Sequence, residues 1–235
     1  MEKKFELTEN YVVNESGTKL YQIKCIKTFK YAKEGELGGY IEKEENLSQE
    51  GDAWVFGNAR VYGNAWVYGD ARVLGNAWVL GNAQVLGDAE VFGNAWVSGD
   101  AEVSDNAWVS GNARVYGNAR VSGNARVLGN AWVCGNARVL GNAWVSGSAE
   151  VSGNACLKSN ADHCGFDCFG SSNRHTHAYL TGDNTVEITC GCFRGSIEEF
   201  EKKVKNTHTG TVYENQYNAI INVIKIKFGL DETSK

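Results

Sequence analysis

The feature that most constrains the fold of this chain is a block of six-residue repeats from residue 51 to residue 158. The block divides into eighteen consecutive copies of Gly-Asn/Asp-Ala-x-Val-x without an insertion. Ala fills the third place in all eighteen copies and Val the fifth place in seventeen, with Leu157 as the exception. Asp105 once replaces the opening Gly, and Ser148 once replaces Asn or Asp. A fixed short period of this kind indicates a solenoid of stacked coils.

Within one copy the residues alternate as they do in a β-strand. Ala and Val are two positions apart and therefore point to the same side, whereas the residue between them points to the other side. The Gly-Asn pair tolerates the positive φ angle of a sharp corner. A helix is disfavoured because a period of six matches no 3.6-residue stripe. We therefore expect short parallel strands with Ala and Val inside and the fourth place outside.

The phrase Val-x-Gly-Asn-Ala-x resembles the hexapeptide repeat of left-handed parallel β-helix proteins. The resemblance implies an all-β solenoid in which three copies make one triangular coil, so that eighteen copies make about six coils. Gly stands two places after Val here instead of directly after it, which departs from the family pattern. A flattened coil of twelve residues is therefore an alternative, and the left-handed sense rests on the resemblance alone.

The regions on either side of the repeats differ in kind from the block. We divide the chain into an N-terminal β cap (1–38), a parallel β-helix (39–164) and a small C-terminal α+β domain (165–235). FELTENYVV and LYQIKCIKTF predict a pair of strands, and in the worn copies that follow, Asn46 and Leu47 fall on the Asn and Ala places. In the tail, HAYL and VEITCGC predict a hairpin, and the capping box from Ser196 to Glu199 predicts a helix over 197–205. Covered ends argue against an open fibre.

The outward fourth place carries all seven Trp residues of the chain, together with six Arg and three Glu. If a coil has eighteen residues, one face presents Arg60, Trp78, Trp96, Arg114 and Trp132 in succession. Stacking between rungs could serve only to stiffen the sheet. Trp and Arg are also the residues enriched at binding hot spots, and we take these five as the candidate binding residues. The partner is a second copy, a trimer being one form, or another protein.

The resemblance extends to hexapeptide acyltransferases, which carry a catalytic His, usually beside a loop that interrupts the coils. The repeat block contains neither a His nor such a loop, because all four His residues follow it. We therefore expect a non-enzymatic, rigid scaffold. The alternative is an acyltransferase-like enzyme that takes its base from the C-terminal domain, where His175, His177 and His208 are the candidates.

The C-terminal domain concentrates thiols and imidazoles, which are the ligands that zinc prefers. The candidate metal ligands are Cys164, Cys168, Cys190, Cys192, His175 and His177. Their spacing matches no zinc motif closely, so buried or inert thiols and a catalytic Cys–His pair are alternatives. Zinc is the one cofactor that the sequence suggests, and otherwise we expect none.

The net charge of −5 is spread without a basic patch, so no nucleic-acid partner is expected. No stretch reaches the roughly 20 apolar residues of a membrane helix, and the opening MEKKFELTEN is no signal peptide. Free thiols are then typical of the cytoplasm. The stretches YAKEGELGGYIEKEENLSQEGDAWV, GSSNRHTHAY and ITCGCFRGSIEEFEKKV are similar to uncharacterised hexapeptide-repeat proteins of phages and prophages. That similarity implies an accessory protein in a bacterial or phage-infected cell.

Overall fold

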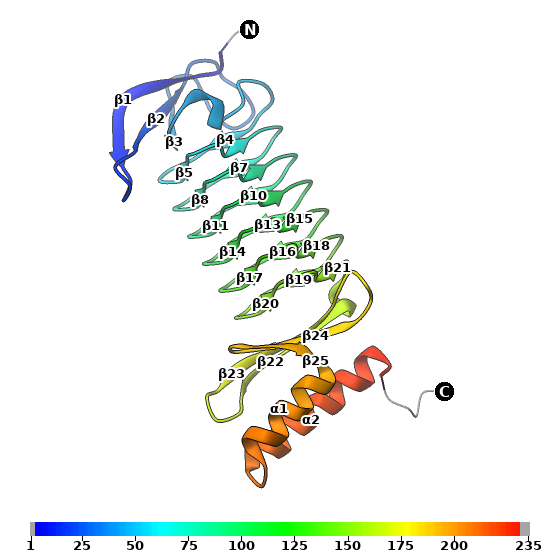
Figure 1. The fold of residues 1–235 in the computed structure, drawn as a ribbon. Coiled ribbons are helices and arrows are strands. Elements are labelled where there is room, and N and C mark those ends of the chain that lie inside the picture. The colour runs from blue at the N-terminus through cyan, green and yellow to red at the C-terminus, as the bar shows by residue number, and fades with distance from the viewer. Residues whose placement is uncertain (1–2, 231–235) are drawn as a thin grey trace.

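The computed structural model describes residues 3–230, in which a β cap, a solenoid and a sheet–helix tail follow one another along one axis (Figure 1). The cap contains β1 (Phe5–Val13), β2 (Lys19–Cys25), β3 (Leu37–Ile41) and the short 3-10 turn η1 (Glu44–Asn46). The repeats form β4 to β21, each two residues long, in three parallel sheets that make the three sides of the coil. The all-β solenoid expected from the period of six is confirmed.

We name the three sides by their strands. The ladder face consists of β5 (Arg60–Val61), β8 (Trp78–Val79), β11 (Trp96–Val97), β14 (Arg114–Val115), β17 (Trp132–Val133) and β20 (Glu150–Val151). The second face consists of β4 (Trp54–Val55), β7 (Arg72–Val73), β10 (Glu90–Val91), β13 (Trp108–Val109), β16 (Arg126–Val127) and β19 (Trp144–Val145). The third face consists of β6 (Trp66–Val67), β9 (Gln84–Val85), β12 (Glu102–Val103), β15 (Arg120–Val121), β18 (Arg138–Val139) and β21 (Cys156–Leu157).

From β4 to β18, each strand pairs in parallel with the strand eighteen residues later, as Val61 does with Val79. This register gives the triangular coil and excludes the flattened coil of twelve residues. The solenoid has about seven turns instead of six, because β3 pairs with β5 and Leu47 bridges to Val67 ahead of the regular block. The left-handed sense of the coil stays a prediction.

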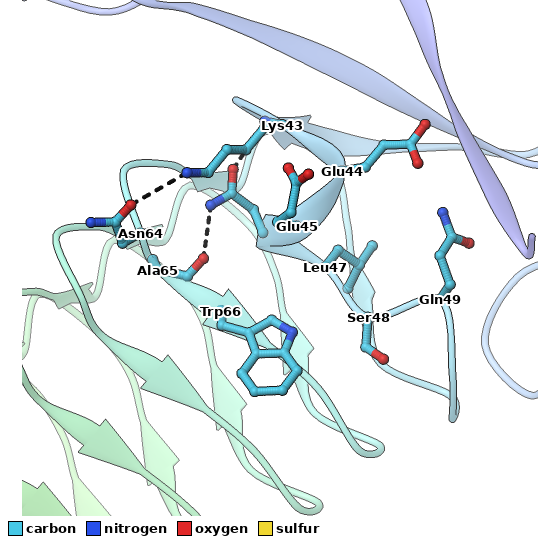
Figure 2. Close-up of a pocket in the computed structure, with 10 residues that line it drawn as sticks. Lys43, Glu44, Glu45, Leu47, Ser48, Gln49, Asn64, Ala65 and Trp66 are labelled. Atoms are coloured by element: carbon cyan, nitrogen blue, oxygen red, sulfur yellow. Dashed lines mark hydrogen bonds between the residues drawn. The ribbon is translucent and has the colours of Figure 1, made fainter.

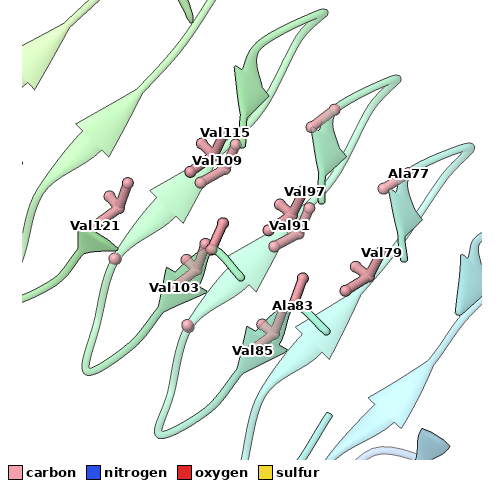
Figure 3. Packing of buried hydrophobic residues seen from close by; sticks show 14 of the residues in the cluster. Ala77, Val79, Ala83, Val85, Val91, Val97, Val103, Val109, Val115 and Val121 are labelled. Atoms are coloured by element: carbon pink, nitrogen blue, oxygen red, sulfur yellow. The ribbon is translucent and has the colours of Figure 1, made fainter. Parts of the chain in front are cut away.

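The core of the solenoid is a column of Ala and Val side chains from all three sheets (Figure 3). Every repeat Val is fully buried, and no repeat Ala is more than 3% exposed. Burying one Val side chain contributes roughly 2 kcal/mol of hydrophobic free energy, so the stack gains stability with every rung. The small Ala methyl beside each Val lets three strands approach across a narrow triangle.

The corners use the Gly-Asn pair in the way that the sequence predicts. Gly117, for example, has φ +73°, and a Cβ at this position would lie 3.0 Å from the backbone N of Gly135 in the next coil. Only Gly fits here without strain. The adjacent amides form ladders along the corner, in which Asn94 Nδ2 donates to Asn112 Oδ1 at 3.2 Å and Asn112 Nδ2 to Asn130 Oδ1 at 3.0 Å. Such amide stacking supports the coils from outside the core.

The N-terminal cap occupies backbone groups that the first coil would otherwise leave unpaired. On the ladder face, the N–H of Tyr40 donates to the carbonyl of Ala59 at 2.9 Å. On the third face, Asn46 is fully buried and its Nδ2 donates to the carbonyl of Ala65 at 2.8 Å. Leu47 pairs with Val67 and so takes a Val place, which corrects the Ala place expected for it. Ile41 and Leu47 stand 20 residues before Val61 and Val67 instead of 18, so two extra residues between Leu47 and Val55 shift the register.

One Trp departs from the outward rule. Trp54 is only 1% exposed, because Phe5 and Phe29 of the cap pack edge-on against its indole at centroid distances of 6.2 and 5.3 Å. Its strand β4 is the first on the second face, where Lys4 Nζ also donates to the carbonyls of Gly51 and Ala53. The fourth place therefore points outward from the coil, but its side chain is buried where the cap folds over it.

The tail consists of the 3-10 turn η2 (Asn160–Asp162), an antiparallel sheet of β22 (His163–Phe169), β23 (Arg174–Leu180), β24 (Val186–Cys190) and β25 (Phe193–Ser196), and helices α1 (Ile197–His208) and α2 (Val212–Phe228). The hairpin β23–β24 and the capping box of Ser196 and Glu199 are confirmed. One sheet face packs on the helices and the other meets the last coil. The sheet thus covers the second end of the solenoid.

The last coil is capped on all three faces. On the second face the N–H of Trp144 donates to Asn160 Oδ1 at 2.7 Å. On the ladder face the carbonyl of Glu150 accepts from His177 Nδ1 at 3.0 Å. On the third face the N–H of Gly182 donates to the carbonyl of Asn154 at 2.8 Å. Because these edge groups already have partners, end-to-end addition of another solenoid is disfavoured.

Candidate interaction face

The five candidate binding residues lie one above another on the ladder face, as the eighteen-residue coil requires. The parallel register aligns Arg60 with Trp78, Trp78 with Trp96, and Trp96 with Arg114. It continues from Arg114 to Trp132 and from Trp132 to Glu150 at the last rung. The structure therefore brings together all five residues and adds a terminal carboxylate to the row.

Neighbouring rungs of this row are in contact. The Trp78 and Trp96 rings have centroids 5.1 Å apart at an interplanar angle of 42°. The Arg60 guanidinium lies 5.2 Å from the Trp78 ring, and that of Arg114 lies 5.3 Å from the Trp132 ring. These contacts are cation–π and aromatic interactions that stiffen the sheet. They leave Trp96 and Trp132 36% and 41% exposed, so stacking does not bury the indoles.

A groove of about 250 Å³ lies in the middle of the ladder face. It is lined by Leu80, Trp96, Ser98, Arg114, Tyr116 and Trp132. The aromatic and aliphatic walls are apolar, and the Arg114 guanidinium supplies one fixed positive charge. The hollow arises at the sixth place of the repeat, where Ser98 is small between the larger Leu80 and Tyr116. The sixth place changes from apolar residues in the early repeats to frequent Ser in the later ones. This change therefore shapes the surface.

The other two faces have shorter rows of accessible Trp and Arg, the longest being Trp108, Arg126 and Trp144 on the second face. On the second face the cap covers Trp54, and the Arg72 guanidinium lies 5.0 Å from the ring of Tyr31, a cap residue. Arg72 also forms a salt bridge with Glu90 on the next rung. The third face has a single Trp, Trp66, above a polar row. The ladder face thus offers the longest row of accessible Trp and Arg side chains that the chain's own cap leaves uncovered.

A second hollow lies at the N-terminal end of the third face, between η1 and Trp66 (Figure 2). Lys43 and Asn46, two of its polar side chains, already have partners. Lys43 Nζ donates to Asn64 Oδ1 at 3.3 Å, and the Lys43 N–H donates to Asn46 Oδ1 at 3.0 Å. The hollow follows from the way the capping segment crosses the first coil, and the repeat pattern gives no sign of it.

In the tail the structure clusters three imidazoles at the junction with the last coil. His163 Nδ1 lies 3.0 Å from His177 Nε2, and the His175 and His177 rings have centroids 5.6 Å apart. His175 Nδ1 contacts Asp167 Oδ1 at 2.6 Å. Because His177 Nδ1 donates to the carbonyl of Glu150, its Nε2 accepts from His163. The cluster joins the tail to the solenoid by hydrogen bonds.

The cysteines among the candidate metal ligands lie elsewhere. Cys164 and Cys190 point to the helix side of the sheet, where both belong to the core with α1 and α2, whereas His175 and His177 lie on the solenoid side. Cys168 and Cys192 are exposed. Within residues 3–230, no group of three or more His, Cys, Asp or Glu side chains is placed to hold a metal ion. Alternation along the strands separates the two ligand types, and zinc binding by this set stays a prediction.

The environment of these groups determines their proton affinity. Burial lowers the pKa of His177 to about 3, and burial also lowers the pKa of His163. Burial raises the pKa of the Cys164 thiol to about 11, which disfavours the thiolate that would bind zinc or act as a nucleophile. His177 is 1% exposed, so a substrate cannot reach it without opening the junction. His208 instead lies against Tyr217, with ring centroids 5.4 Å apart.

The strands, corners and capped ends together define a parallel β-solenoid repeat protein. Its repeats are similar to the YdcK beta-solenoid repeat, whose family model matches residues 53–69, 65–81, 107–121, 113–129, 119–135 and 131–147. All of these segments lie inside the block of eighteen hexapeptides. No curated protein matches the chain. In residues 3–230 no helix combines the length and apolar character that crossing a membrane requires.

Proposed function

We propose that this chain is a rigid, non-enzymatic scaffold whose ladder face docks a protein, either a second copy or another chain. The observation that carries the proposal is the uncovered row from Arg60 to Trp132 with a groove between Trp96 and Trp132. Exposed Trp and Arg around an apolar hollow have the composition of an interface core. A monomer rarely exposes a contiguous apolar patch of more than a few hundred Å².

The rest of the molecule supports a scaffold role. The core of the coil is a dry column of Ala and Val, and both ends have backbone and side-chain caps. Side chains on such a frame hold fixed spacings from rung to rung, so little conformational entropy is lost when a partner binds. Two observations support a setting in the cytoplasm of a bacterial or phage-infected cell. The seven cysteines are free, and stretches of the C-terminal sequence are similar to phage and prophage proteins.

Site-specific photo-crosslinking in the cells that naturally produce the chain tests this proposal. A photoreactive Phe analogue is placed at Ser98, which lines the groove of the ladder face. The matched control places it at Ser122, which has the same place in the repeat and the same partial burial, next to the third face. We expect a discrete cross-linked protein band from position 98 and none of comparable yield from position 122.

The mass of that band identifies the partner. Twice the mass of the chain indicates a second copy, and any other discrete mass indicates a different protein. Equal or absent cross-linking at the two positions would contradict the docking role of the ladder face.

A further inference from the structure

The outward residues of the ladder face form favourable pairs when the row is set against a second copy of itself that runs in the opposite direction. From first to last rung the fourth place is Arg60, Trp78, Trp96, Arg114, Trp132 and Glu150. Reversal sets Arg60 opposite Glu150, Trp78 opposite Trp132, and Trp96 opposite Arg114. These three combinations are an ion pair, an aromatic pair and a cation–π pair.

The sixth place of the same repeats shows the same complementarity in size. Reversal sets Leu80 opposite Cys134 and Ser98 opposite Tyr116. Each large side chain thus meets a small one, and the phenol of Tyr116 faces the hollow beside Ser98. The groove is lined by residues of both central rungs, Trp96 with Ser98 and Arg114 with Tyr116, so it straddles the point about which the order reverses.

We propose that two copies of the chain pair through their ladder faces in an antiparallel arrangement, with a two-fold axis parallel to the strands and midway between the Trp96 and Arg114 rungs. This axis reverses the order of the rungs and keeps each place of the repeat opposite itself. The proposal rests on the docking role of the ladder face and names its occupant. Each dimer contains two Arg60–Glu150 pairs, one at either end of the contact.

The other faces lack this property. On the second face the same reversal sets Arg72 opposite Arg126, which places like charges together, and the cap already covers Trp54. On the third face Trp66 would meet Cys156, so a single indole per chain would enter the contact. The ladder face alone combines opposite charges at its ends with Trp in the middle.

The size of the face is compatible with a specific contact. Six rungs at the strand spacing extend about 29 Å, and a side of six residues is about 20 Å wide, which gives roughly 550 Å² per chain. The total of roughly 1,100 Å² lies just above the smallest area of a specific protein interface. At the outer edge Ser152 is buried beneath Tyr179 of the tail, so its side chain takes no part in the contact. We therefore expect a dissociation constant in the micromolar range.

Sedimentation equilibrium of the full chain over a range of concentrations tests the pairing by charge reversal. Glu150→Arg sets Arg opposite Arg60, and Arg60→Glu sets Glu opposite Glu150. Each single change should raise the dissociation constant of the dimer about tenfold or more, because like charges then meet at both ends. The double variant R60E/E150R restores the opposite pairing and should return the constant to within about threefold of the parent value.

Arg138→Glu is the matched control, because Arg138 holds the same place of the repeat on the third face, and it should leave the dimer unchanged. Circular dichroism verifies that each variant is folded. A purified chain that stays monomeric, or a dimer in which the double variant fails to recover, would overturn the antiparallel pairing. A cross-link from Ser98 to a different protein would still uphold the docking role, so the two proposals fail separately.

Discussion

The ammonium of Lys4 donates hydrogen bonds to the carbonyls of Gly51 and Ala53, each at 2.9 Å, where the first coil of the second face begins. A side chain thus takes the place of a missing strand. Lys4 is 5% exposed, and burial lowers its pKa to about 8. The contact shows how a solenoid with a uniform interior can end without exposing its backbone.

Lys4→Met should destabilise the fold by about 2–4 kcal/mol, because Met fills the volume but leaves the two buried carbonyls without donors. The comparison variant is Lys3→Met, since Lys3 forms an exposed salt bridge with Glu44 and should cost less than about 1 kcal/mol. Urea unfolding followed by circular dichroism measures both free energies. Equal losses in the two variants would show that Lys4 does not cap the edge.

Comparing Gly117→Ala with Gly17→Ala separates two costs of a side chain at a corner glycine. One is the steric contact with the next coil, and the other is the strain of a positive φ angle. Both glycines have a positive φ, but a Cβ at Gly17 meets no atom within 4 Å, whereas at Gly117 it lies 3.0 Å from the next coil. Gly17→Ala should therefore cost about 1 kcal/mol, and Gly117→Ala about 3 kcal/mol or more. Thermal unfolding of the two variants gives the order, and a larger loss at Gly17 would be inconsistent with this packing.

Trp54 and Trp144 hold the same place at opposite ends of the second face and differ in burial, at 1% and 47% exposed. Trp54→Ser should cost about 3–5 kcal/mol because it empties a site between Phe5 and Phe29. Trp144→Ser should cost less than about 1 kcal/mol. Unfolding free energies from urea titration test the difference. Similar losses would mean that the cap does not pack on Trp54.

The junction of the tail and the solenoid should weaken in acid. His177 has an unfolded pKa near 6.5 and a folded pKa of about 3, so only the opened state takes up a proton between these values. The stabilisation is complete above pH 6.5 and is lost as the pH falls toward 3, by about 2 kcal/mol at pH 5. Hydrogen exchange of the β23 amides, corrected for the intrinsic rate, reports this opening.

His177→Asn keeps a donor for the carbonyl of Glu150 and removes the titrating group. The variant should lose most of the pH dependence between 7.5 and 5, with a smaller slope left because burial also lowers the pKa of His163. An unchanged slope would assign the effect to other groups.

The repeat period predicts the solenoid because one six-residue phrase sets strand, core and corner at every rung. The same periodicity places Arg60 and Trp78 on one face once the coil has eighteen residues. It does not predict that the cap buries Trp54, because Phe5 and Phe29 are far from Trp54 in the sequence. Nor does it predict that Leu47 takes a Val place, because two extra residues before Val55 interrupt the period. In the tail, Cys164 and Cys190 face the helices whereas His175 and His177 face the solenoid, because neighbouring residues of a strand point to opposite sides of the sheet. Their closeness in sequence does not reveal this separation. The reversed complementarity of the ladder face becomes visible only when the rungs are stacked.

The three faces carry their own Trp residues, and this allows a direct test of the ladder face within one molecule. Hydroxyl-radical oxidation of Trp96 and Trp132 is compared with that of Trp108, Trp144 and Trp66 by mass spectrometry, in dilute and in concentrated protein. Trp96 and Trp132 should become protected as concentration rises, while the three Trp of the other faces react at an unchanged rate. Uniform protection of all five, or none, would contradict pairing of two copies through the ladder face.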